Sequence, residues 1–297
     1  FKFRIMNSRR LPQKQGEWID RTKEVEFYFE GKKIVGYKGD VITSALVASG
    51  HSILARSFKY HRPRGFLSLA NHDANILLET KEKTNIRADV TLPIEGQEYT
   101  VVNTFGGLKL DFARVLQCFS VFLPVGFYYK AFYRPRFLFP YWEKIIRQLA
   151  GLGKIGVNHD KSRFPTQRLF CDVLIVGAGA SGLSAAAQLL GTGLKVVIAD
   201  ENAEFGGTSS FTGPENSEER VKVKNLLKQI KTSSFLLLKS HFAAGFYADK
   251  TIPLVGANGI YLVHANAVIV ATGAYEQPAV FRNNDLPGVV LSSAVSR

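Results

Sequence analysis

Cysteine is scarce in this chain of 297 residues, where it occurs only as Cys118 and Cys171. Two distant cysteines provide neither a disulfide framework nor the spacing of a metal site, which favours a reducing compartment. A secretory signal is not apparent either, because the basic stretch FKFRIMNSRR is followed by no apolar segment. The uncharged stretch from 173 to 194 is rich in glycine and does not suit a membrane span. We therefore expect a cytoplasmic protein without membrane contact.

Acidic residues are also few, with 25 Asp and Glu against 38 Lys and Arg, so the net charge is +13. Such an excess could serve a nucleic acid, a membrane surface, an acidic partner or an anionic cofactor. The basic residues are scattered along the chain, which favours ordinary solvated surface charge. Hydrophobic residues make up 46% of the chain and charged residues 21%, values typical of a globular protein, and the length suggests two domains.

A dinucleotide-binding pattern begins with the apolar strand predicted at 173–176. Gly177, Gly179 and Gly182 follow it as GxGxxG, and a helix is predicted from Ala180 to Leu190. The first glycine permits a tight turn, the second lets the backbone approach a pyrophosphate, and the third lets the helix pack closely on the strand. The N–H groups at the start of the helix would point at the pyrophosphate.

The second strand of this unit is predicted from Lys195 to Ala199, and two acidic residues, Asp200 and Glu201, follow it. They lie at roughly the twenty-residue distance at which an acid holds the hydroxyls of an adenosine ribose. Because NAD and FAD both carry this ribose, the acid does not distinguish the two cofactors.

Two further small-residue segments would approach the same dinucleotide. One is the turn from Glu204 to Thr208, and the other is Thr272 and Gly273, after a buried strand predicted at 267–271. Parallel strands present their ligands at the carboxyl edge of the sheet. The candidate cofactor-binding residues are Gly177, Gly179, Ala180, Ser181, Gly182, Asp200, Glu201, Gly206, Gly207, Thr208, Thr272 and Gly273. No pattern indicates a catalytic residue or a metal ligand.

The N-terminal part predicts a small β-grasp, ferredoxin-like module. Strands are expected at 25–29 and 33–37, a helix after Asp40, and strands at 66–69 and 75–79. In ferredoxins with this order, cysteines after the helix hold an iron–sulfur cluster. No cysteine occurs between positions 52 and 93, so we expect a module without a cluster.

The densest basic stretch of the chain, RSFKYHRPRG, lies at 56–65. Arginines interleaved with aromatics can bind single-stranded nucleic acid, but they can also pair with carboxylates or hold a cofactor phosphate. A structural or interdomain role is the favoured interpretation.

The middle of the chain, from 105 to 153, is rich in aromatic residues and interrupted by proline. It indicates a buried connector or a subunit interface, with one clear helix at 141–149. The C-terminal part predicts a helix at 217–231 capped by Asn216, and strands at 235–238, 245–248, 259–264 and 267–271.

The predicted fold class is α/β, with three regions. These are a ferredoxin-like β-grasp module over 1–100 without cluster ligands, an aromatic connector and linker over 101–167, and an incomplete, Rossmann-like FAD/NAD(P)-binding domain over 168–297. The number of predicted strands does not close a doubly wound sheet, so we expect a piece of a longer domain.

Several motifs together resemble the flavoproteins with two dinucleotide-binding domains, and among them the alpha subunits of heterotetrameric sarcosine oxidase. They are the glycine pattern, EFGG at 204–207, ATGAYEQPAVFRNNDLPGV at 271–289, RSFKYHRPRG at 56–65, PVGFYYKAFYRP at 124–135 and WEKIIRQLAGLG at 142–153. The resemblance extends over nearly the whole chain. Relatives with the same basic stretch carry a cysteine-liganded cluster, whereas this sequence resembles the branch that has lost the ligands.

The resemblance implies an oxidoreductase acting on CH–NH donors as one subunit of a complex with β, γ and δ subunits. Such complexes convert sarcosine to glycine, hydrogen peroxide and a one-carbon unit that passes to tetrahydrofolate or is released as formaldehyde. The amine is oxidised on the partner subunit, FMN lies at the interface between subunits, and the alpha subunit holds NAD, with FAD as the alternative at the same site. Tetrahydrofolate would bind a C-terminal region that this chain lacks.

Two other interpretations stay open. One is an FAD-dependent subunit of another amine, amino-acid or opine dehydrogenase. The other is a non-catalytic scaffold that binds its dinucleotide structurally. A nucleic-acid partner is not expected.

Overall fold

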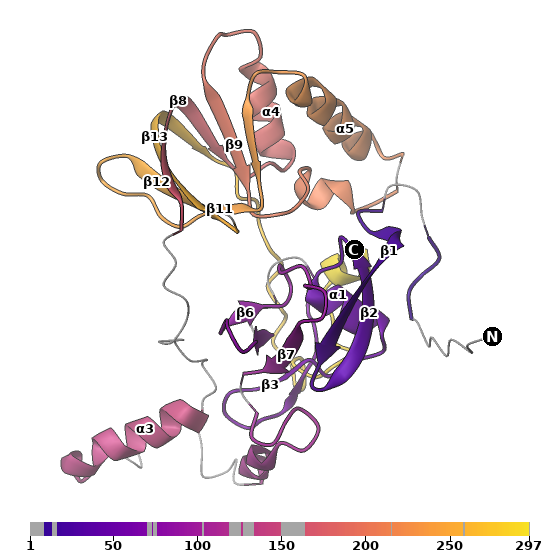
Figure 1. The fold of residues 1–297 in the computed structure, drawn as a ribbon, viewed down its shortest axis with the longest axis vertical. Helices are drawn as coiled ribbons and strands as arrows, with labels where there is room; N and C mark the ends of the chain where they lie inside the picture. Colours follow the sequence, from indigo (N-terminus) through magenta and orange to yellow (C-terminus); the bar gives the residue numbers. More distant parts are fainter. Residues whose placement is uncertain are drawn as a thin grey trace. The chain divides into compact units, whose positions relative to one another are not determined.

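The computed structural model describes residues 9–13, 17–69, 73, 76–102, 104–118, 126, 134–149, 164–214, 216–257 and 259–296. The chain divides into two compact units (Figure 1). The first comprises residues 1–160 together with 276–295, and the second comprises 161–275 with 296–297. The predicted domain boundaries at 100 and 167 assign residues 276–295 to the last domain, whereas these residues group with the first unit. The boundaries stay a prediction.

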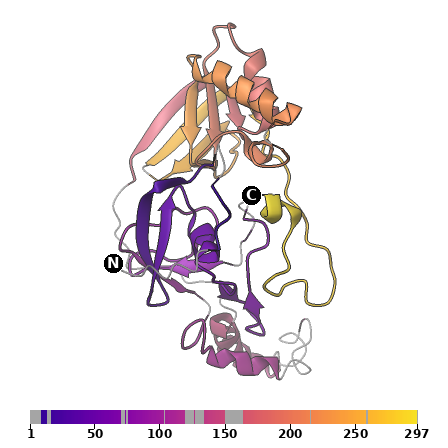
Figure 2. The same cartoon turned by 90° about the vertical axis from the view of Figure 1, so that its right-hand side faces the viewer.

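The first unit contains a five-stranded sheet in the order β2-β1-β7-β5-β6. β1 pairs antiparallel with β2 and parallel with β7, and β5 is antiparallel to both β7 and β6. β1 and β7 thus lie side by side near the centre of the sheet, and α1 lies between them in sequence, as a β-grasp requires (Figures 1 and 2). The elements are β1 (Asp20–Phe29), β2 (Lys32–Lys38), α1 (Ile42–Ala48), β5 (Leu77–Glu79), β6 (Ile86–Arg87) and β7 (Glu98–Val101).

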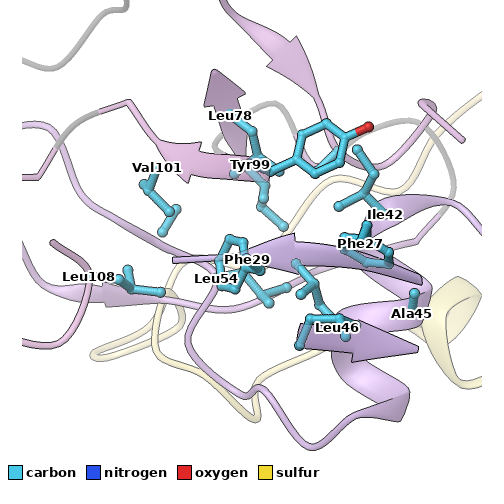
Figure 3. Packing of buried hydrophobic residues seen from close by; sticks show 14 residues of the cluster. Phe27, Phe29, Ile42, Ala45, Leu46, Leu54, Leu78, Tyr99, Val101 and Leu108 are labelled. Carbon is cyan, nitrogen blue, oxygen red and sulfur yellow. The ribbon is translucent and has the colours of Figure 1, made fainter. Parts of the chain in front are cut away.

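A hydrophobic core joins the helix to the sheet in this unit. Phe27 and Phe29 point from β1 toward α1, where Leu46 is fully buried, and Tyr99 meets Phe27 edge to face (Figure 3). Alternation along the strands places these residues on one face. The predicted hairpin and the helix are confirmed, and the module buries a core of its own.

The predicted strand at 66–69 does not form. The N–H groups of Leu67, Ser68 and Leu69 instead donate to the buried carboxylate of Asp73, at 2.8, 2.9 and 2.9 Å. A side chain that accepts from consecutive N–H groups competes with strand pairing. This carboxylate therefore replaces a neighbouring strand.

The basic stretch forms a short hairpin of β3 (Ala55–Arg56) and β4 (Pro63–Arg64). The buried Arg56 guanidinium donates to the Leu108 carbonyl at 2.8 Å. His61, fully buried, lies with its Nδ1 2.6 Å from the Asp111 carboxylate. These two residues have structural roles, as the favoured interpretation of the basic stretch predicted.

Of the middle segment, the structure describes two 3-10 helices, η1 (Phe112–Gln117) and η3 (Arg136–Leu138), and the α-helix α3 (Phe139–Leu149). The predicted helix at 141–149 is confirmed. The aromatic positions at 119–125 and 127–133, and the predicted linker over 150–163, lie outside the described residues.

The second unit is built on a six-stranded sheet in the order β10-β9-β8-β13-β12-β11. The first four strands in this order are parallel, whereas β12 and β11 run antiparallel to their neighbours. This is the Rossmann-like sheet that the glycine pattern predicted. Its strands are β8 (Thr166–Val176), β9 (Val196–Asp200), β10 (Leu236–Lys239), β11 (His241–Ala243), β12 (Thr251–Gly256) and β13 (Gly259–Val270).

Two helices, α4 (Ala180–Gln188) and α5 (Glu218–Lys231), cover one face of this sheet (Figure 1). Leu183 and Ala186 of α4 share a buried cluster with Val223 and Ile230 of α5 and with apolar side chains of β8 and β9. The described part of the chain also includes η4 (Gly207–Ser210) and α6 (Ser292–Ser296). No helix among the described residues is long and apolar enough to cross a membrane.

Three details of the C-terminal part differ from expectation. The strand predicted at 245–248 is absent, because the chain turns around Lys250, whose N–H donates to Tyr247, before β12 begins. The strands predicted at 259–264 and 267–271 form one strand, β13. Ser217, not Asn216, is the N-terminal cap of α5, and Glu219 accepts from the Ser209 hydroxyl at 2.6 Å.

The two cysteines lie in different surroundings and provide a test of the second core. Cys171 of β8 is buried in a cluster of sheet residues, and burial raises the pKa of its thiol to about 11, whereas Cys118 is exposed. We expect a thiol reagent at mildly alkaline pH to label Cys171 at least about a hundredfold more slowly than Cys118, because the thiolate is the reactive form. Mass spectrometry of labelled peptides, with Cys171→Ser as control, measures this. Equal rates in the folded protein would contradict the buried position.

Candidate functional site

The carboxyl ends of β8 and β13 form the point at which the parallel sheet changes direction. From β8 the chain proceeds to β9 and β10 on one side, and it then returns to place β13 on the other side of β8. Ligands of open α/β sheets bind in the crevice at such a switch point, beyond the carboxyl ends of the strands. The glycine turn from 177 to 182 follows β8 at this position.

Gly177 brings the turn against the end of β13. Its φ is +100°, and a Cβ atom at this position would lie 2.2 Å from the Ala271 carbonyl oxygen. Its N–H donates to Ala199 of β9 at 2.8 Å, while the Ala271 N–H donates to the Val176 carbonyl at 2.8 Å. Because no side chain fits between these backbones, this position requires glycine.

Gly182 and Gly179 serve different purposes within the turn. A Cβ atom on Gly182 would lie 1.9 Å from the Gly177 carbonyl oxygen, so this glycine lets α4 pack against the turn. Gly179 is the N-terminal cap of α4, and the nearest atom to a Cβ there would be the Gly207 Cα, 3.9 Å away. The protein leaves space at Gly179, where a pyrophosphate would approach the backbone.

The start of α4 provides the hydrogen-bond donors of the site. The first N–H groups of a helix have no partner within it, and here they belong to residues that include Ala180, Ser181 and Gly182. Ser181 is exposed. A negative charge at this end of the helix would be stabilised by the N–H groups and by the helix dipole.

The turn at 206–207 packs directly against the glycine turn. The Gly206 N–H donates to the Ala178 carbonyl at 2.8 Å, and Gly206 has a φ of +123°. A Cβ atom on Gly207 would lie 2.9 Å from the Gly179 Cα. Thr208 follows as an exposed residue of η4. The structure therefore places this segment beside the glycine turn.

Asp200 connects the end of β9 to the glycine turn. The side chain is buried, and its Oδ2 accepts from the Ala178 N–H at 2.7 Å. Its Oδ1 accepts from the backbone N–H and from the side-chain amide of Asn202, both at 2.8 Å. Glu201 is exposed. Sequence patterns did not identify Ala178 or Asn202, because their contribution comes from backbone geometry and one local contact.

Thr272 and Gly273 follow β13 at the same edge of the sheet. The Thr272 nitrogen would be 3.1 Å from a Cβ atom on Gly177, and both residues are exposed. Gly273 has a φ of +74° with open space around it. The structure thus brings together, through backbone contacts, segments that lie about ninety residues apart in the sequence. Among the described residues, no group of three His, Cys, Asp or Glu could hold a metal ion.

Two family models match the chain. Residues 22–104 match the 2Fe-2S iron-sulfur cluster binding domain, and residues 172–214 match the FAD dependent oxidoreductase family. The first match covers the β-grasp sheet, and the second covers the glycine turn with β9 and η4.

Curated relatives match over a larger part of the chain. The alpha subunit of sarcosine oxidase from Rhizobium meliloti (strain 1021) is 33% identical over 98% of this chain, and that from Corynebacterium sp. (strain P-1) is 27% identical over 97%. The chain spans about a third of the length of these relatives, 31% and 28%. An opine oxidase subunit of Agrobacterium tumefaciens (strain Ach5) is 28% identical over 42% of the chain and 28% of its own length.

Among solved structures, the crystal structure of L-proline dehydrogenase from P. horikoshii matches 91% of this chain and 44% of its own chain, with a TM-score of 0.60 and 21% identity. This similarity supports the predicted fold class of a small sheet module with a Rossmann-like domain. The resemblance to sarcosine oxidase alpha subunits is confirmed by homologues that cover nearly the whole chain. Both family matches fit the FAD-dependent oxidoreductases.

The expected cofactors require correction. We expected NAD at the glycine turn, FMN at an interface and no iron–sulfur cluster, but the match over 172–214 implies FAD and the match over 22–104 is to a cluster-binding domain. NAD, with FAD as the alternative at the same site, came from the resemblance to the alpha subunits, and the exclusion of a cluster came from the missing cysteines and the resemblance to the branch that lacks them. Residues 22–104 contain no cysteine, the ligand of such clusters, so the residues present do not fit this group.

The two glycines of α4 provide a test of this geometry. Gly182→Ala is expected to lower the free energy of unfolding by about 1–3 kcal/mol or more, because its methyl group meets a backbone oxygen. Gly179→Ala meets no atom closer than 3.9 Å and is expected to cost at most about 1 kcal/mol, the loss of a favourable cap residue. Urea denaturation of both variants measures the difference. Equal destabilisation by the two substitutions would contradict the packing of α4 described here.

Proposed function

We propose that this chain, homologous over nearly its whole length to sarcosine oxidase alpha subunits, forms the FAD-binding part of a flavin-dependent subunit in an amine-oxidising complex. The observation that carries the proposal is the glycine turn at the switch point between β8 and β13. There, three segments present backbone at a crevice, and Gly179 leaves the position beside it open.

The residues of the crevice have distinct parts in holding FAD. The N–H groups at the start of α4 would donate to the pyrophosphate, with Gly207 and Thr208 on one side and Thr272 and Gly273 on the other. The crevice uses backbone, so it recognises the diphosphate by shape and hydrogen bonding and needs no cationic side chain. Bound FAD supplies the capacity to accept a hydride equivalent, the chemistry that oxidation of an amine requires.

Asp200, not Glu201, is the proposed ribose acceptor. Its carboxylate is already fixed at the turn by the Ala178 N–H, and its Oδ2 retains a lone pair after accepting that bond, whereas Oδ1 already accepts two bonds from Asn202. An acid held in this way is preorganised for the ribose hydroxyls, whereas Glu201 is exposed at the strand end.

The proposed reaction of the whole complex is the oxidative demethylation of sarcosine. Sarcosine, dioxygen and water would give glycine, hydrogen peroxide and formaldehyde, or the one-carbon unit would pass to tetrahydrofolate. The support for this substrate is homology to the alpha subunits, whose matched segments cover nearly all of this chain. We also propose β, γ and δ subunits as partners, since each of these relatives is named as one of several subunits.

The FAD assignment is tested by substituting Gly179 in the full-length protein. Gly179→Ala is expected to lower the affinity for FAD at least about tenfold, because its methyl group occupies the path of the pyrophosphate. FAD per protein after gel filtration, read from the absorbance of released flavin, measures the loss. Gly245→Ala is the matched control, since a Cβ atom there meets only Tyr247 at an ordinary 3.6 Å.

The same assay distinguishes the two acids. Asp200→Asn is expected to weaken FAD binding about tenfold, the loss of hydrogen bonds to a charged acceptor, while Glu201→Gln stays within about twofold. Thermal unfolding of the variants without FAD separates a ribose effect from damage to the turn. Retention of FAD by Gly179→Ala at the wild-type level would overturn the assignment of the site.

A further inference from the structure

A pocket of about 520 Å³ lies in the first unit, between the basic stretch after β3 and the returning segment 276–295. Its walls include Arg62, Arg64 and Phe66 on one side and Phe281, Arg282 and Asp285 on the other. The volume falls within the range of about 300–1,000 Å³ that small-molecule sites occupy. The glycine turn contributes nothing to this pocket, so it is a separate site.

The pocket already contains one anionic group, the Asp285 carboxylate, which pairs with two of its arginines. One carboxylate oxygen of Asp285 lies 3.0 Å from the Arg62 guanidinium, and the other lies 2.5 Å from that of Arg64. Arg64 also donates to the Asp285 carbonyl at 3.2 Å, and Arg62 donates to the Asn283 side-chain oxygen at 2.8 Å. One carboxylate is therefore bridged by two guanidinium groups, an arrangement that fixes both arginines for further hydrogen bonds.

The pocket retains positive charge after this pairing. Three arginines line it, Arg62, Arg64 and Arg282, and Asp285 is the one acidic residue among the residues lining it, so the balance is +2. Burial, with the nearby Arg62 charge as a second cause, lowers the pKa of the Arg64 guanidinium. Arg282 is exposed and has no hydrogen-bond or ion-pair partner among the described residues.

Apart from Asn283 and Asn284, the remaining walls are apolar and would suit the body of an organic molecule. Phe281 is 53% exposed, and Phe66, Leu67 and Pro278 lie beside the arginines. At Gly65, a Cβ atom would come within 3.1 Å of the Pro287 Cα, so the basic stretch packs closely on the returning segment. Because the two segments that carry the arginines pack closely, the arginines hold a fixed arrangement, which favours a ligand site over ordinary surface charge.

We propose that this pocket binds an organic dianion, with Arg282 and the free faces of the bridged Arg62 and Arg64 pairing its charges and Phe281 and Phe66 packing against its body. The two charges of such a ligand balance the +2 excess of the pocket. The proposal does not depend on FAD, since its residues belong to the first unit and the FAD site to the second.

The test uses the full-length protein and three probes at constant ionic strength, phenyl phosphate, succinate and the monoanion acetate, with inorganic phosphate as a reference for phenyl phosphate. Titration calorimetry is expected to show that at least one dianion binds about tenfold more tightly than acetate, because a second charge-assisted pair forms. The tighter dianion identifies whether the natural ligand carries a phosphate or two carboxylates. Tighter binding of phenyl phosphate than of inorganic phosphate would show that the aromatic wall contributes.

Arg282→Gln is expected to weaken dianion binding about tenfold and to leave acetate binding nearly unchanged. Arg168→Gln is the matched control, because Arg168 is also an exposed arginine without a recorded partner among the described residues, but it lies on β8 of the other unit. FAD content should be the same in both variants. Equal weakening by both substitutions, or equally weak binding of all three probes, would overturn the proposal.

Discussion

The close contact between the carboxyl ends of β8 and β13 is the constraint on which the candidate site depends. Gly177 lies so near the Ala271 carbonyl that no side chain fits, and Gly182 lies as near to Gly177. These two contacts fix the direction of α4, and the Asp200 carboxylate then fixes the turn to β9 through the Ala178 N–H. A crevice lined by backbone needs such rigidity, because its donors cannot be reoriented by side-chain rotation.

The two units offer different hydrogen-bond donors to a ligand, backbone N–H groups in the second unit and arginine side chains in the first. The second unit presents N–H groups at a glycine turn, which suits the diphosphate of FAD. The first unit presents arginines bridged by Asp285, which suits a carboxylate or a phosphate. The segment 276–295 follows β13 of the second unit in the sequence but belongs to the first unit, to whose pocket it supplies Arg282 and Asp285.

Local sequence predicted much of the site, because strand, glycine turn, helix and strand follow one another without a gap between 173 and 200. The hairpin of β1 and β2 was predictable for the same reason. Two features that depend on distant contacts were not predictable, the parallel pairing of β1 with β7 and the return of 276–295. The carboxylate of Asp73 in place of a strand is a local contact, but it depends on a side-chain orientation that the sequence does not give. The preference for NAD over FAD, taken from the resemblance to the alpha subunits, also failed, and the acid after β9 could not correct it because it binds a ribose that both cofactors share.

The most direct measurement is anaerobic addition of sarcosine to the purified full-length complex, followed by the visible absorbance of its flavin. We predict that FAD is released on denaturation, that sarcosine bleaches the oxidised flavin band, and that Gly179→Ala reduces the amount of FAD released while Gly245→Ala does not. A complex that contains no FAD, or whose flavin stays oxidised with sarcosine but is reduced by proline or an opine, would contradict the account.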